Sequence, residues 1–132
     1  KEFDNIKNEV KFSDNTRFDF LLNNKKEKCF LEVKNVTLFR DSKIAEFPDA
    51  ITSRGTKHLN ELIKAKQKGY LGCILYLIQR EECNSFKIAK DIDKNYGIAF
   101  EKAESKGIKI LCYNCKLSNE EIIINKQIKY ES

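Results

Sequence analysis

Apolar and polar positions alternate along two early segments that are typical of neighbouring strands. Residues 16–22 and residues 29–39 carry the apolar positions, and the polar run of residues 23–28 separates them. A short polar run between two strand-like segments indicates a β-hairpin. If residues 23–28 form the hairpin loop, residues equally far from the loop on its two sides pair with each other, because loop length sets the register.

The later part of the chain contains further strand-like segments. Residues 70–78 form a continuous apolar run, which is typical of a strand buried on both faces of a sheet. Residues 108–117 form another strand. Residues 122–124, together with Ile128, indicate a short final strand or an edge hairpin.

Helical spacing of apolar residues is found in the first residues and again after the only proline. Residues 2–8 are predicted to form a short helix, because helical spacing joins Phe3, Ile6 and Val10. A longer helix is expected after Pro48. It is capped by Asp49 or Thr52, runs to about Lys68 and ends at Gly69.

A third helix begins at Asp93 and is closed by Gly107, with an apolar side formed by Tyr96, Phe100 and Ala103. Residues 40–46 and the stretch between the apolar run and Asp93 are expected to be loops. The resulting order, α-β-β-β-α-β-α-β, predicts an α/β fold with a mixed central sheet flanked by helices. No repeat or linker divides the chain, so residues 1–132 are expected to form a single domain.

The composition of the chain says more about where the protein is located in the cell than about what it does. The chain has 25 basic and 20 acidic side chains, a formal charge of +5 that is compatible with a polyanionic partner but too small to demonstrate one. No apolar run is long enough to span a membrane, and no signal peptide is recognisable at the start. The chain begins at Lys1 and contains no methionine, which indicates a fragment or a processed product.

The five cysteines lack the spacing of a disulfide framework and favour a reducing compartment, that is, the cytoplasm. Cys112 and Cys115 form a lone C-x-x-C motif within a predicted strand, where alternate residues point to opposite faces. No second cysteine pair accompanies them. We therefore expect no structural zinc site.

Candidate chemistry comes from the predicted hairpin. A loop of residues 23–28 places Asp19 opposite Glu32, and strand alternation places Lys34 on the same face as Glu32. Two carboxylates with a neighbouring lysine are the minimum set for metal-assisted phosphodiester hydrolysis. A solvated sheet face is an equally open interpretation, since similar acid-x-Lys spacings begin at Glu9, Asp41 and Glu104.

Several ordered motifs resemble the sugar fermentation stimulation protein (SfsA) family. The matching stretches are spread over nearly the whole chain, at residues 8–12, 16–22, 29–38, 47–52, 54–62, 78–80, 91–96 and 107–111. The resemblance implies a cytoplasmic bacterial or archaeal protein that binds DNA and regulates genes for sugar utilisation, notably maltose. It also implies an N-terminal OB-like barrel, absent from this chain, before a restriction-endonuclease-like domain of the PD-(D/E)XK nuclease superfamily.

The resemblance assigns roles to individual residues. Asp19, Glu32 and the carbonyl of Val33 would hold Mg²⁺ or Mn²⁺, with Lys34 as a catalytic residue and Glu9 as a further acid that anchors a second water or metal. The alternative for Glu9 is a solvated acid.

The same resemblance assigns DNA contacts to Arg17, Arg54, Lys57 and His58. Arg54 and His58 are four residues apart and therefore lie on one side of the helix. The chain departs from the family at Thr16, where serine is common, and at Ser53, where an acid is common.

Three function classes remain open from the sequence. The chain is a metal-dependent DNA nuclease, a DNA-binding regulator that uses a nuclease fold without cleavage, or a protein-interaction domain. The sequence gives no information on the oligomeric state.

Overall fold

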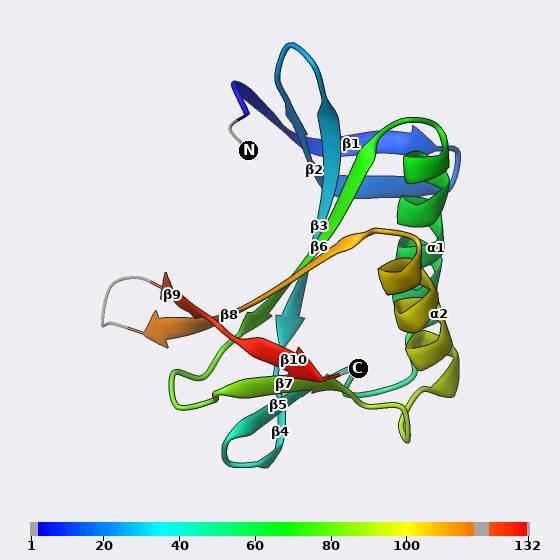
Figure 1. Cartoon of the computed structure of the whole chain (residues 1–132). Coiled ribbons are helices and arrows are strands. Elements are labelled where there is room, and N and C mark those ends of the chain that lie inside the picture. The colour runs from blue at the N-terminus through cyan, green and yellow to red at the C-terminus, as the bar shows by residue number, and fades with distance from the viewer. Residues whose placement is uncertain (1–2, 118–121, 132) are drawn as a thin grey trace.

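The structure of the chain is a computed structural model, and it describes residues 3–117 and 122–131. Two sheets and two helices make up this described part (Figure 1). The central sheet has six strands in the order β1 (Asn5–Ser13), β2 (Thr16–Asn23), β3 (Lys28–Val36), β6 (Leu71–Ile78), β8 (Lys109–Leu117) and β9 (Ile122–Gln127). The smaller sheet has four strands in the order β10 (Lys129–Glu131), β7 (Ser85–Ile88), β5 (Ile44–Phe47) and β4 (Leu38–Asp41).

The central sheet is mixed, as the sequence predicts. Strands β3, β6 and β8 are parallel, and antiparallel strands flank them on both sides. Helix α1 (Ser53–Gln67) lies between β3 and β6 in the chain, and helix α2 (Lys94–Ser105) lies between β6 and β8. Both helices lie on the same side of this sheet (Figure 1).

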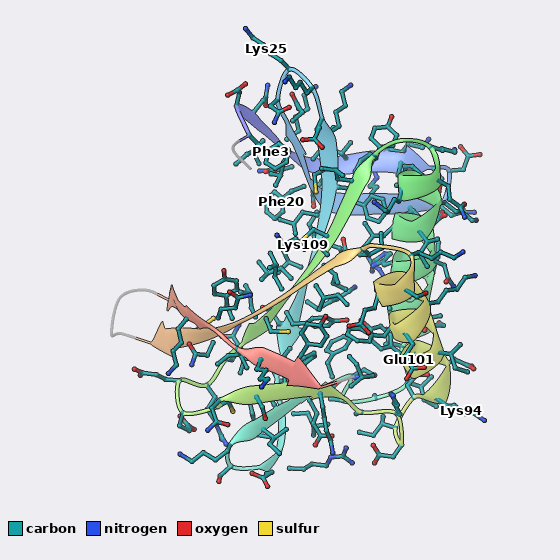
Figure 2. The ribbon with its side chains drawn as sticks, in the orientation of Figure 1. Phe3, Phe20, Lys25, Lys94, Glu101 and Lys109 are labelled. Carbon is teal, nitrogen blue, oxygen red and sulfur yellow. The ribbon has the colours of Figure 1, made fainter. Side chains whose placement is uncertain are left out.

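The predicted hairpin is confirmed together with its register. Leu22 pairs with Cys29 and Phe20 pairs with Leu31, as a loop centred within residues 23–28 requires. Asn24 closes the turn, since its Oδ1 accepts hydrogen bonds from the backbone N–H groups of Lys26 and Glu27 at 2.9 and 2.8 Å. Figure 2 shows the side chain of Lys25 at the tip of this hairpin.

The short helix predicted over residues 2–8 is wrong within the described residues. Strand β1 occupies this part of the chain and pairs with β2 from Asn5 to Ser13. Helical spacing of three apolar residues is a weak signal in so short a segment, because an isolated helix of this length is marginal in water. Pairing with the edge of β2 gives the same backbone groups a regular set of partners instead.

The two predicted loops contain most of the smaller sheet. Strands β4 and β5 form a hairpin where the sequence predicts a loop over residues 40–46, and β7 lies in the stretch before Asp93. Each of these strands has only four residues, too few for a period of two to emerge from the local pattern. The smaller sheet packs on the helix side of the central sheet, where the rings of Phe86 and Tyr76 lie 4.6 Å apart between centroids.

Strand β6 is buried on one face rather than on both. The even-numbered positions Gly72, Ile74, Tyr76 and Ile78 are buried, whereas the odd-numbered leucines are partly exposed and Cys73 alone among the odd-numbered positions is buried. A Cβ atom added to Gly72 would lie 3.6 Å from Cδ2 of Leu62 in α1, so the buried face is the one that the helices cover.

The helix boundaries follow the predicted caps. Thr52 caps α1, accepting a hydrogen bond from the N–H of Gly55 at 2.9 Å, and Asp93 caps α2 by accepting one from the N–H of Tyr96 at 3.0 Å. The second oxygen of Asp93 accepts a hydrogen bond from the N–H of Thr52 at 2.8 Å. One carboxylate therefore joins the beginnings of both helices. Gly107 follows α2 in a left-handed conformation (φ 89°), as a C-terminal glycine does.

Two strands lie near the C-terminus of the described chain. The final strand or hairpin expected near residues 122–128 is present as β9 and β10. Neither helix of the described chain is long and apolar enough to cross a membrane.

Candidate functional site

The regular alternation of β2 breaks at Asp19. Phe18 is 1% exposed and packs in the core, whereas Phe20, also at an even position, pairs with Leu31 on the opposite face. The β2–β3 ladder ends at this pair. On the other side of β2, Glu9 falls opposite Asp19 between two regular pairs and has a left-handed backbone (φ 48°). The hairpin of β1 and β2 therefore bends away from β3 at Asp19.

Side chains replace the ladder bonds that the bend removes. The N–H of Asp19 donates to Oε1 of Glu32 at 3.2 Å, and the N–H of Val33 donates to Oδ2 of Asp19 at 2.8 Å. The sequence-predicted opposition of Asp19 and Glu32 is thus present, but as two reciprocal bonds between side chain and backbone. Each carboxylate accepts a hydrogen bond from the backbone of the other strand. These two bonds offset part of the repulsion between the two acids, which can therefore lie close together.

Glu32 is almost fully buried, with 3% of its surface exposed. Its Oε2 atom lies 3.1 Å from Nζ of Lys34 and 2.6 Å from Nδ1 of His58. Burial alone would raise the pKa of Glu32, but the hydrogen bond to His58 and the charge of Lys34 outweigh it and hold the pKa below the ordinary value of 4.5. Glu32 is therefore an ionised carboxylate at neutral pH, on the same face as Lys34, as alternation predicts.

His58 reaches Glu32 from α1 and is 5% exposed. An ionised carboxylate only accepts hydrogen bonds, so Nδ1 of His58 carries the proton in this contact. Lys34 Nζ lies 3.0 Å from the same nitrogen, which closes a triangle of Glu32, Lys34 and His58. Spacing on the helix gives no indication of this contact. The sequence predicts His58 as a DNA contact only, and its burial beside Leu59 and Glu61 is not indicated by the sequence.

A basic groove of about 610 Å³ opens beside this triangle. All four side chains that the resemblance assigns to DNA line it, and its full lining is Lys11, Ser13, Asp14, Asn15, Thr16, Arg17, Ser53, Arg54, Lys57 and His58. The first turn of α1 contains no acidic residue. The positive end of the helix dipole therefore adds to the charge of Arg54 and Lys57 instead of being offset.

Glu61, which the sequence does not single out, stabilises the side of the groove that the β1–β2 turn forms. Its Oε1 atom accepts hydrogen bonds from the hydroxyl groups of Ser13 and Thr16 at 2.8 and 3.0 Å. Lys57 adds a hydrogen bond from Nζ to the carbonyl of Asn15. These contacts hold the β1–β2 turn against α1. The position of this turn sets the position of Arg17.

The amino-acid sequence matches the family described as "Sugar fermentation stimulation protein RE domain" over residues 1–121. The chain belongs to this SfsA family.

Relatives in the SfsA family match this chain over most of its length. The sugar fermentation stimulation protein homolog of Pelagibacter ubique is 55% identical over 126 residues, which are 96% of this chain and 54% of the relative. The homolog of Ruegeria sp. is 43% identical over 92% of this chain and 53% of the relative. The chain thus spans about half the length of these curated relatives.

A solved structure shares the fold. Pyrococcus furiosus SfsA, described as a complex with Ca²⁺, matches 96% of this chain and 54% of its own chain with a TM-score of 0.87 and 27% identity. The mixed central sheet with two helices is therefore the fold of an SfsA protein.

The side chains at the bend of this SfsA chain suit a hard cation only in part. Among the described residues, no three His, Cys, Asp or Glu side chains cluster as a ready-made metal site. Asp19 and Glu32 supply two carboxylates beside the Val33 peptide, and Oδ1 of Asp19 has no hydrogen-bond partner in the described part of the chain. Mg²⁺ commonly uses one or two carboxylates and completes its octahedron with water and substrate phosphate. The site fits that pattern, while Glu9 is exposed on the neighbouring strand.

Proposed function

We propose that this chain is a restriction-endonuclease-like domain of the PD-(D/E)XK type that binds DNA and hydrolyses phosphodiester bonds with a divalent metal. The observation that carries the proposal is the buried, ionised Glu32, which contacts Lys34 on its own strand and Asp19 across the bend. An ionised carboxylate that is buried this deeply is retained mainly where its charge has a use, because burial without partners is costly.

The metal of this proposal is Mg²⁺ or Mn²⁺. Asp19, Glu32 and the Val33 carbonyl would hold it, and Glu9, opposite Asp19 on β1, would anchor a second water or metal. A bound divalent ion lowers the pKa of its water and polarises a phosphate oxygen. The Ca²⁺ in the description of Pyrococcus furiosus SfsA supports a hard-cation site in a relative of the same fold.

The remaining side chains have distinct tasks in this proposal. Lys34 places an ammonium group beside Glu32, where it stabilises negative charge that develops on the phosphate. His58 donates to the same carboxylate and fixes its orientation. Arg17, Arg54 and Lys57, along the groove, bind backbone phosphates next to the scissile group.

A DNA-binding regulator without cleavage is the second candidate, and one observation favours it. The ammonium group of Lys34 already balances the charge of Glu32 and His58 donates to the same oxygen, so this carboxylate has its partners without a metal. The groove retains its basic lining in either case. A role in the expression of sugar-utilisation genes, which the family's name suggests, is compatible with both candidates.

We also propose a cytoplasmic location, since the five cysteines are buried and lack the spacing of a disulfide framework. The chain would then act as the nuclease-like part of a longer SfsA protein.

Calorimetric titration of Mn²⁺ and Mg²⁺ tests the proposal. We expect wild-type binding that Glu32→Gln and Asp19→Asn remove and that Glu101→Gln retains, because Glu101 lies on α2 and pairs with Lys90. Cleavage of labelled DNA with Mn²⁺ should follow the same pattern. Salt-sensitive DNA binding without metal binding in any variant would overturn the nuclease proposal and leave the regulator. Absence of DNA binding at low salt would overturn both.

A further inference from the structure

The face of the central sheet that points away from both helices is apolar. Its side chains come from the odd-numbered positions of the three parallel strands, and they include Leu31, Val33, Leu75, Leu77, Leu111 and Tyr113. Register places these residues side by side, since Val33 pairs with Leu75 and Leu75 pairs with Leu111. Phe20 continues the surface onto β2 through its pairing with Leu31. We call this surface the open face.

No helix or strand of the described chain covers the open face. Helix α1 contacts the sheet on the side of Gly72, and α2 contacts it through Phe100, whose ring lies 6.1 Å from that of Tyr76 between centroids. The smaller sheet also packs against Tyr76, through Phe86. All three layers therefore lie on the even-numbered side. Figure 2 shows the side chains of Phe20 and Lys109 on the other side of the sheet, away from both helices.

Strand β1 lies at the edge of the central sheet, beside β2, and does not cover the open face. The sequence predicts a helix over residues 2–8, but residues 5–8 form part of β1 within the plane of the sheet. The six apolar side chains of the parallel strands named above are each partly exposed, whereas Cys73, at an odd-numbered position between Leu31 and Lys109, is buried. Parallel strands are normally covered on both faces, and a contiguous apolar surface of this kind marks an interaction site.

We propose that the open face is the docking surface for a second folded unit, of the kind that the longer SfsA relatives carry outside the matched half. The relatives from Pelagibacter ubique and Pyrococcus furiosus match 96% of this chain with only 54% of their own lengths. The remainder of each is long enough to form a domain, and a domain tethered to this one meets the open face at high effective concentration. The unit that docks presents a complementary apolar surface with an acidic group near Lys109.

This docking proposal is independent of DNA binding and catalysis, because Glu32, Lys34 and the groove lie on the helix side of the sheet. A failure of one proposal therefore leaves the other intact.

The test compares this 132-residue chain with a full-length hybrid in which it replaces the matched half of the Pelagibacter ubique relative. Leu75→Cys places a thiol on the open face, and Ile98→Cys places one on the exposed side of α2 as the matched control. We expect both thiols to alkylate readily in the single chain. In the hybrid, the thiol at position 75 should react at least about tenfold more slowly, while the control is unchanged.

Hydroxyl-radical footprinting of Tyr113 in the unsubstituted proteins gives the same comparison without a substitution in the sheet. Equal reactivity of both positions in chain and hybrid would overturn the proposal. It would also be overturned if concentration-dependent dimers of the single chain protect position 75 and the hybrid does not, since the occupant would then be a second copy.

Discussion

Nδ1 of His58 lies 2.6 Å from Oε2 of Glu32, and this contact joins α1 to the strand that carries the candidate metal ligands. Lys34 shares the same oxygen at 3.1 Å. The carboxylate is thus the centre of a buried polar cluster, and both of its side-chain partners depend on it.

Removal of the charge of Glu32 should therefore destabilise the fold. We expect Glu32→Gln to lower the free energy of unfolding by about 3 kcal/mol, because it leaves the ammonium group of Lys34 buried without a counter-charge. Urea denaturation at pH 7 measures the change. The double variant Glu32→Gln/Lys34→Met removes both charges and should recover part of the loss. Equal stability of wild type and Glu32→Gln would show that the cluster contributes nothing.

The same carboxylate should make stability depend on pH in the acidic range. The pKa of Glu32 in the folded protein lies below its ordinary value of 4.5, so the unfolded state takes up its proton first as pH falls. Stability from this group is complete above about pH 5 and is lost as pH falls through the lowered folded pKa. Denaturation curves from pH 7 to pH 3 should show a smaller acid-induced loss in Glu32→Gln than in wild type.

Two glycines in helices should respond to alanine to different degrees. A Cβ at Gly55 would lie 2.9 Å from Cγ2 and Oγ1 of Thr52 and 3.1 Å from Cε1 of Tyr96, so it would disturb the cap of α1. We expect Gly55→Ala to destabilise the protein by about 1–2 kcal/mol, near the value of a lost cap. At Gly97 a Cβ would lie 2.8 Å from Cγ of Lys90, close to the backbone of that residue, so the Lys90 side chain would have to shift. This contact should offset the gain in helix propensity of about 1 kcal/mol, and Gly97→Ala should change stability in thermal unfolding less than Gly55→Ala does.

Salt dependence separates the groove from other lysines. If the groove binds DNA phosphates, Arg54→Gln and Lys57→Gln should each reduce the slope of log K against log salt by about 0.9. Lys25→Gln, at the tip of the β2–β3 hairpin (Figure 2), is the matched control and should leave the slope unchanged. Fluorescence anisotropy at several salt concentrations measures the slopes. An equal effect of all three substitutions would indicate a diffuse charge effect and no defined groove.

The bend at Asp19 predicts different roles for the two phenylalanines beside it. Phe18 packs against Phe12 and Phe30 with ring centroids 5.5 and 5.0 Å away, whereas Phe20 lies on the open face. We expect Phe18→Ala to reduce stability by about 3–5 kcal/mol and Phe20→Ala to reduce it by less than half as much in this chain. Chemical denaturation of both variants tests the assignment of the two faces.

The hairpin register was predictable because a polar loop and two apolar flanks leave few alternatives. The pairing of Phe20 with Leu31 follows directly from the loop position. Strand β1 and the smaller sheet were not predictable in this way. Their strands are short or edge elements, and long-range pairing rather than local periodicity stabilises them.

The two acids of the candidate site were predictable from the sequence. The side chains that hold these acids and the groove in place were not. Opposition of Asp19 and Glu32 follows from the register, whereas the contact of His58 with Glu32 depends on how α1 crosses the sheet. Glu61 has a comparable role, since its hydroxyl partners Ser13 and Thr16 lie far away in the sequence. Packing between elements decides both contacts, and no spacing within one element indicates them.

Alternation along β3 has a consequence for how the domain can change during evolution. Glu32 and Lys34 point to the helix side, while Leu31 and Val33, their direct neighbours, belong to the open face. A single inserted or deleted residue in this strand would exchange the two sets and disable both surfaces at once. The same short stretch of sequence is therefore constrained twice. A change of register that moves the site residues on one face also moves the apolar residues on the other face.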